Sequence, residues 1–193
     1  GVDAPLTELG RQQAEAVGAR LAETTIDAVY TSTMQRARDT GLAIASHHDL
    51  TISELHSLRE IHLWERLPQD KGLVESLGAD ELKRIMRAGN RSRRWDSYPH
   101  AEPRDGFRSR VVTELDRIAA DHSGERVVVA CHGGVINAYL AHIMESDLDT
   151  VCTVHHTSIT IVRAMDDFRR VVQVNDHEHV KSFQTEINPI NAA

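Results

Sequence analysis

Residues 127–135 read Val-Val-Val-Ala-Cys-His-Gly-Gly-Val, and this stretch decides the fold class. Its β-branched apolar run predicts a buried strand over Arg126–Cys131, and the apolar spacing that follows predicts a helix over Gly134–Met144. The glycines between them let backbone amides approach a ligand closely. A buried strand that leads through a short turn into a helix is typical of α/β proteins with a parallel sheet.

The same alternation of helices and strands continues on both sides of this stretch. Apolar residues at helical spacing predict further helices, and short β-branched runs predict further strands. The expected helices are Thr7–Glu23, Thr33–Ser46 and one through Phe107 and Ile118, and the expected strands are Asp27–Ser32, Leu50–Ser53, Thr157–Val162 and Arg170–Val174. The predicted fold is α/β, a three-layer sandwich with a mostly parallel central sheet and helices on both faces.

One region departs from this regular alternation. From Leu58 to about Gly106 the periodicity loosens, and only one helix is expected, near Ala79–Ala88. A chain of 193 residues has the length of one domain, and it contains no internal repeat and no low-complexity linker. We therefore expect a single domain over residues 1–193, in which residues 62–106 form a small insertion, or cap, over the site.

Composition excludes several classes of function. Lys and Arg number 22 against 29 Asp and Glu, so the net charge of −7 argues against a nucleic-acid partner. No apolar run approaches the length of a membrane span, so no membrane partner is expected either. The two cysteines, Cys131 and Cys152, form no disulfide framework and no zinc motif, which predicts a reducing, cytoplasmic location. A homodimer is left open.

Two of the predicted strands end in residues that suit a phosphate group. Residues 30–40 read Tyr-Thr-Ser-Thr-Met-Gln-Arg-Ala-Arg-Asp-Thr, which places Arg36 in the first turn of a helix. His132 stands at the tip of the other strand, and Gly133 follows it. Ligands of open α/β sheets bind beyond the carboxyl ends of the strands, where free amides and a guanidinium both donate to phosphate. A solvated arginine and an incidental histidine in a glycine turn are the structural alternatives.

Five ordered motifs together resemble the histidine phosphatase superfamily, in its phosphoglycerate-mutase-like branch. The motifs are Pro5-Leu-Thr-Glu-Leu-Gly, the segment that begins at Tyr30, Leu58-Arg-Glu-Ile, Pro99-His-Ala-Glu and Cys131-His-Gly-Gly. The closing segments Thr157-Ser-Ile-Thr and Val174-Asn-Asp are also similar to those of the family. Each motif alone is weak, but their common order extends over much of the chain.

The resemblance implies a phosphatase that hydrolyses a small phosphorylated substrate through a phosphohistidine, with no cofactor and no metal. By resemblance, Glu60 is the proton donor and His132 a catalytic histidine, while Arg36, Gly133 and His156 bind the phosphoryl group. A donor at neutral pH needs a raised pKa, which burial would supply. The structural alternative for Glu60 is a surface glutamate paired with its neighbour Arg59.

The chain departs from the family at two places. The nucleophilic histidine of the family lies in an Arg-His-Gly motif before the Pro-Leu-Thr segment, and no Arg-His-Gly occurs in residues 1–193. We expect this nucleophile to be encoded upstream of Gly1; the alternative is a non-catalytic phospholigand-binding module. The second departure is Ile61-His-Leu-Trp-Glu-Arg, which leaves the substrate open. A phosphoglycerate mutase is the alternative within enzymes.

Overall fold

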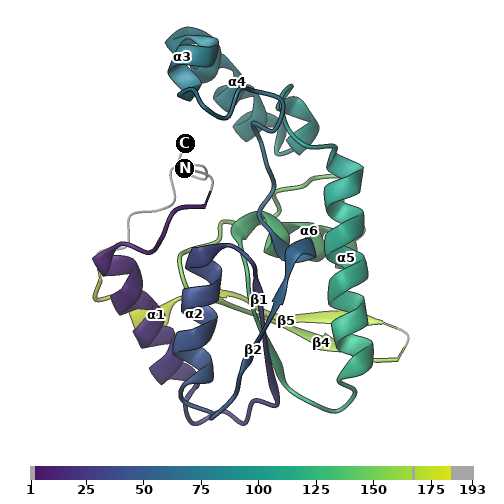
Figure 1. Cartoon of the computed structure of the whole chain (residues 1–193). Coiled ribbons are helices and arrows are strands. Elements are labelled where there is room, and N and C mark those ends of the chain that lie inside the picture. The colour runs from purple at the N-terminus through teal and green to yellow at the C-terminus, as the bar shows by residue number, and fades with distance from the viewer. Residues whose placement is uncertain (1–2, 167, 184–193) are drawn as a thin grey trace.

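The computed structural model describes residues 3–166 and 168–183, and its centre is a three-stranded parallel sheet (Figure 1). The strands are β1 (Ala28–Ser32), β2 (Ile52–Leu55) and β3 (Val127–Ala130), in the order β2-β1-β3. Val29 of β1 pairs with Ile52 on one side and with Val128 on the other. The carboxyl ends of β1 and β3 therefore meet at the same edge of the sheet.

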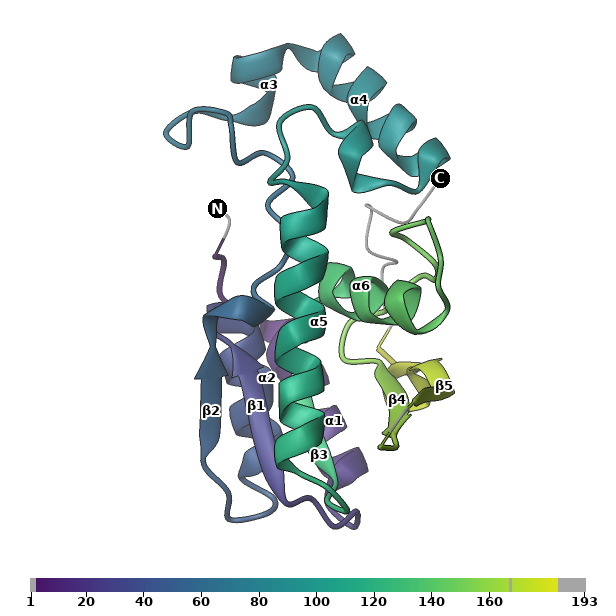
Figure 2. The same cartoon turned by 90° about the vertical axis from the view of Figure 1, so that its right-hand side faces the viewer.

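Helices cover both faces of this sheet (Figure 2). On one face lie α1 (Glu8–Leu21) and α2 (Gln35–Ala45), and on the other lie α5 (Arg104–Asp121) and α6 (Gly133–Ile143). Val29 packs under α1 and α2, whereas its neighbour Tyr30 packs toward α5 and α6, because successive side chains of a strand point to opposite faces. The three-layer α/β arrangement predicted from the sequence is confirmed.

The region of loosened periodicity forms two helices beyond the carboxyl ends of the strands (Figure 1). These are α3 (Leu73–Leu77), which the sequence did not predict, and α4 (Ala79–Ser92), which runs four residues further than expected. Ile85 of α4 packs with Tyr98 and Ala101 in a small apolar cluster of its own. Residues 62–106, called the cap below, thus have an apolar cluster of their own, while Trp95 packs into the cluster under α5 and α6.

The last two strands differ from the expected single sheet. The strands β4 (Ile159–Ala164) and β5 (Arg169–Asp176) pair with each other in antiparallel fashion and form a sheet of their own. Only four residues, 165–168, separate them in the chain, and the Met165 N–H donates a hydrogen bond to the Phe168 carbonyl at 2.9 Å. Strands joined by so short a connection pair antiparallel, because parallel pairing needs a long crossover.

From the sequence we expected no membrane-spanning segment and no disulfide framework. None of the described helices is both long and apolar enough to cross a membrane. Cys131 and Cys152 are both free thiols.

Candidate active site

The carboxyl ends of β1 and β3 bring Ser32 and His132 together. His132 Nε2 lies 2.9 Å from Ser32 Oγ, and the His132 side chain is only 7% exposed. Its backbone is extended, with φ −129° and ψ 163°, and it is the N-cap residue of α6. His132 therefore occupies the predicted position at the strand tip, with its imidazole held by a hydroxyl from the neighbouring strand.

The surroundings of His132 keep its imidazole neutral. Burial, together with the positive charges of Arg36, Arg59 and Arg110, lowers the pKa of His132 to about 3, although the charge of Asp3 acts in the opposite direction. Three guanidinium groups therefore act on a neutral imidazole, and donors of this kind suit the oxygens of a phosphate dianion.

The Glu60 carboxylate lies against the first turn of α6. Its Oε2 accepts a hydrogen bond from the Gly134 N–H at 3.1 Å, and its Oε1 accepts one from the Ile61 N–H at 2.9 Å. Burial raises the pKa of Glu60, while these two amides and the charges of Arg36 and Arg110 act in the opposite direction. No salt bridge joins Glu60 to Arg59 in the described part of the chain, so the alternative of a paired surface glutamate does not describe this carboxyl.

Gly134 is required by the position of Glu60. A Cβ atom on Gly134 would lie 2.1 Å from Glu60 Oε1 and 3.1 Å from the Glu60 carboxyl carbon. Because real Cβ atoms do not approach other atoms so closely, any other residue at position 134 would displace the carboxylate. The glycine at this turn thus has an identifiable role, which is to admit Glu60 beside the helix start.

Arg36 lies in the first turn of α2, as the sequence predicted, and its side chain is half-buried. Burial lowers the pKa of its guanidinium, and the charges of Glu60 and Asp3 oppose that shift. Asp3 also accepts a hydrogen bond from the Gln35 N–H at 2.8 Å, at the start of the same helix. A carboxylate from the N-terminal segment therefore caps the helix start at which we expected an anion.

Sequence reasoning missed two arginines of the site, Arg59 and Arg110. Arg110 Nη1 donates to the Arg59 carbonyl at 2.8 Å, and its Nη2 donates to Glu102 Oε1 at 3.1 Å. Glu102 in turn accepts a hydrogen bond from the His62 N–H at 2.8 Å. Arg110 and Glu102 thus hold the backbone on both sides of Glu60. The sequence did carry a signal for this pair, because Glu102 belongs to the Pro99-His-Ala-Glu motif and Arg110 to the helix after it.

The two remaining predicted phosphate ligands differ in their placement. Gly133 is the first residue of α6, directly after His132. His156 is exposed, and within residues 3–166 and 168–183 no contact of its side chain with Arg36, Glu60 or His132 is present. Its role as a phosphate ligand stays a prediction.

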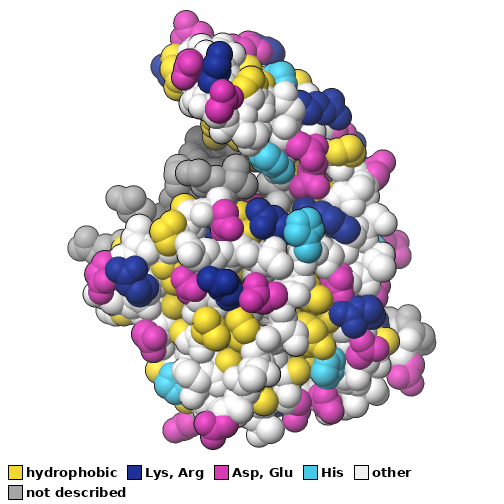
Figure 3. Space-filling view, in the orientation of Figure 1, with side chains coloured by type: hydrophobic (Ala, Val, Ile, Leu, Met, Phe, Trp, Pro, Cys, Tyr) yellow, Lys and Arg dark blue, Asp and Glu magenta, His cyan; other side chains and the backbone are white. Residues whose placement is uncertain are grey.

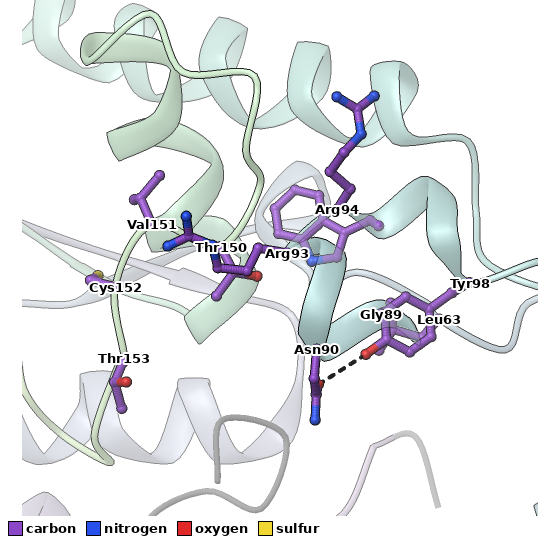
Figure 4. A pocket seen from close by; sticks show the side chains of 11 residues that line it. Leu63, Gly89, Asn90, Arg93, Arg94, Tyr98, Thr150, Val151, Cys152 and Thr153 are labelled. Carbon is purple, nitrogen blue, oxygen red and sulfur yellow. Dashed lines mark hydrogen bonds between the residues drawn. The ribbon is translucent and has the colours of Figure 1, made fainter. Parts of the chain in front are cut away.

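A pocket lies at the boundary between the cap and the loop after α6 (Figure 4), and its lining does not include Arg36, Glu60 or His132. Leu63, Asn90, Arg93 and Tyr98 line it on the cap side, and residues 150–153 line it on the other. The Tyr98 hydroxyl donates to Asn90 Oδ1 at 3.4 Å. Charged and histidine side chains also gather on the face beneath the cap (Figure 3).

Three further histidines, His155, His177 and His179, lie in the segments around β4 and β5. The His155 and His177 rings lie with their centroids 4.0 Å apart, and His179 Nε2 lies 3.1 Å from the Thr157 carbonyl. The described residues contain no group of three or more metal-ligating side chains placed to hold an ion. Burial lowers the pKa of both His155 and His179.

Comparison with known proteins identifies the class to which this fold and this site belong. The family model of the histidine phosphatase superfamily (branch 1) matches residues 1–177. The chain belongs to this superfamily, as its motifs predicted.

The relatives carry both mutase-like and phosphatase names. The phosphoglycerate mutase-like protein 4 of Arabidopsis thaliana is 33% identical over 184 residues, which cover 93% of this chain and 78% of that protein. The metal-independent phosphoserine phosphatase of the same plant is 30% identical, with coverage of 94% and 75%. Among solved structures, Bacillus stearothermophilus YhfR is 27% identical and matches with a TM-score of 0.77 over 93% of this chain and 88% of that one.

The depressed pKa of His132 predicts acid destabilisation of the fold in the absence of phosphate. The folded pKa, about 3, lies below the unfolded value of 6.5, so this stability is complete above pH 6.5 and is lost as the pH falls toward 3. Each unit of pH in this window costs about 1.4 kcal/mol. Urea unfolding at pH 6.5, where half of the unfolded imidazole is already protonated, and at pH 4.5 should therefore show a loss about 2 kcal/mol larger for the wild type than for His132→Gln. Equal losses in the two proteins would contradict it.

Proposed function

We propose that this protein is a phosphatase that hydrolyses phosphomonoesters through a phosphohistidine intermediate. The observation that carries the proposal is the group formed by Glu60, His132 and Arg36 at the carboxyl edge of the sheet. It combines a carboxyl of raised pKa with a neutral imidazole and cationic groups. Phosphatase names among the relatives support the same reaction class.

Each of these groups suits one part of phosphoryl transfer. In the first step a histidine nitrogen attacks phosphorus, the bond from phosphorus to the ester oxygen breaks, and Glu60 gives its proton to the departing alkoxide. In the second step water attacks phosphorus, the bond from phosphorus to the histidine nitrogen breaks, and the ionised Glu60 takes up the proton that water loses, which leaves inorganic phosphate and the free imidazole. Arg36, His132 and the amide of Gly133 stabilise the charge on the phosphoryl oxygens in both steps.

The attacking histidine is proposed to be encoded before Gly1, because residues 1–193 contain no Arg-His-Gly motif. His132, at the only His-Gly pair in the chain, already stands where the family has its second histidine. The coding sequence upstream of Gly1 tests this part of the proposal. An Arg-His-Gly some 15 to 20 residues upstream, a spacing expected from the resemblance to the family, supports the enzyme. A native start without that motif supports the binding module.

The reaction itself is tested with p-nitrophenyl phosphate. The protein with its native start should hydrolyse this ester at mildly acidic to neutral pH with EDTA present, whereas a polypeptide of residues 1–193 alone should have no turnover. Activity that EDTA abolishes and zinc or magnesium restores would contradict the proposal. Robust turnover by residues 1–193 alone would also contradict it, because the nucleophile would then lie within them.

The mutase names among the relatives favour a second candidate, a phosphoglycerate mutase. A mutase returns the phosphoryl group to the organic product, whereas a phosphatase transfers it to water. Incubation with 3-phosphoglycerate therefore distinguishes the two activities. Release of inorganic phosphate supports the phosphatase, and conversion to 2-phosphoglycerate without that release supports the mutase.

A further inference from the structure

A buried carboxylate, Asp149, joins the cap to the rest of the molecule. Its side chain is fully buried in the loop that follows α6. Asp149 Oδ2 accepts hydrogen bonds from the Trp95 N–H of the cap at 2.9 Å and from Arg104 Nε of α5 at 2.8 Å, and Arg108 Nη1 lies 3.3 Å from Oδ1. Removal of one partner from such a buried charged group leaves the others uncompensated. Asp149 therefore holds three separate segments together.

The backbone around Asp149 strengthens the same connection. The Arg93 carbonyl, at the end of α4, accepts hydrogen bonds from the N–H groups of Asp149 and Thr150 at 2.8 and 3.1 Å. The Asp147 carbonyl accepts from Arg104 Nη2 at 2.9 Å and from Arg94 Nη1 at 3.2 Å. One end of the 146–152 loop is thus attached to the cap.

The other end of the 146–152 loop is attached to the turn that carries His132. Asn137 Oδ1 accepts hydrogen bonds from the N–H groups of Val151 and Cys152 at 2.8 and 3.0 Å. Asn137 Nδ2 donates to the Gly133 carbonyl at 3.0 Å. A continuous series of hydrogen bonds therefore runs from the cap through this loop to the first turn of α6.

We propose that Asp149 is a positioning residue, which sets the place of the cap and so the binding of the alcohol part of the substrate. The inference rests on the proposed phosphatase function. The pocket of Figure 4 has one wall from the cap and one from residues 150–153, which are the two segments that Asp149 joins. A looser attachment would change the spacing of these walls. The Asn137 hydrogen bonds that hold the His132 turn do not involve the Asp149 side chain, so the anion-binding groups keep their places.

The test compares two ligands in Asp149→Asn, in the protein with its native start. The KM for β-glycerol phosphate, which has an alcohol part, should rise about tenfold because misplaced walls bind that part poorly. The competitive inhibition constant of inorganic phosphate, which needs only the anion-binding groups, should stay unchanged. The Tm should fall by about 6 to 20 °C, as expected for a broken buried ion pair in a chain of this size.

Three further variants separate positioning from lost stability. Asp147→Asn changes an exposed side chain of the same loop, so it should alter neither KM nor Tm. Val17→Ala removes buried volume from the core-facing side of α1, so it should lower the Tm and leave KM unchanged. If Asp149→Asn fails to fold, Arg108→Gln, which removes the 3.3 Å contact with Asp149 and the 3.2 Å hydrogen bond to the Ser146 carbonyl of the same loop, should give a smaller rise in KM alone.

Two results would overturn the proposed role of Asp149. One is a lower Tm with an unchanged KM, which means that Asp149 acts on stability alone. The other is an equal rise in KM and in the phosphate inhibition constant, which places the damage at the anion site. If the wild type hydrolyses no phosphomonoester, the proposed function fails, and hydrogen exchange then decides on Asp149. Faster exchange over residues 79–98 in Asp149→Asn supports its role, and unchanged exchange there overturns it.

Discussion

Glu60→Gln should slow the hydrolysis of β-glycerol phosphate by about 10²- to 10⁴-fold and that of p-nitrophenyl phosphate far less. An alkoxide needs a proton in order to leave, whereas p-nitrophenolate is already a stable anion. The Glu60 carboxyl has the raised pKa that a donor requires, and a glutamine amide cannot donate in its place. The measurement is kcat/KM for both esters, with the wild type and the variant compared side by side.

Stability provides the control for this result. Because the pKa of Glu60 is raised on folding, its ionised form costs stability as the pH rises. Glu60→Gln should therefore unfold no earlier than the wild type at pH 8. Gly134→Ala should reproduce the selective loss by displacing the carboxylate, whereas Gly106→Ala, whose new Cβ would meet only Pro103 Cβ at 3.9 Å, should not. Equal losses on the two esters in Glu60→Gln would contradict the role as general acid.

Arg36→Ala should reduce kcat/KM by about 10²- to 10³-fold on both esters alike. The guanidinium is proposed to hold the phosphoryl group, which the two esters share, so the leaving group should make no difference. Its position is favourable, since it is half-buried and its charge acts on both Glu60 and His132.

The matched control is Arg38→Ala on the same helix, where the side chain is 41% exposed and lies 4.0 Å from Asp39. This variant should keep the wild-type rate. A loss in Arg36→Ala that is confined to β-glycerol phosphate would instead place Arg36 at the leaving group.

The sequence predicted the parts of the fold that depend on local patterns. The buried strands β1 and β3 and the helices beside them were predictable, because apolar residues recur there at the spacing of each element. The positions of Arg36 and His132 followed from those strand ends. By contrast, the separate β4–β5 sheet was missed, because a β-branched run shows that a strand forms but not which strand it pairs with.

The missed contacts share one physical origin. Asp149 is a single acidic residue in a loop, and its partners Trp95, Arg104 and Arg108 lie more than 40 positions away in the chain. No periodicity indicates such a pairing. The role of Arg110 was hidden for the same reason, since the carbonyls it holds lie in the segment before Glu60. Contacts between charged side chains and distant backbone groups become visible only when the fold is known.

The central claim, transfer through a phosphohistidine, is tested most directly by trapping the phosphorylated protein. The protein with its native start would be mixed with a ³²P-labelled phosphomonoester in EDTA and denatured within one turnover. A phosphorus–nitrogen bond to imidazole is labile in acid and stable in alkali, so the account predicts a label with that behaviour, at a higher level in Glu60→Gln if the second step is slowed. No label, or a label that survives acid, would contradict the account.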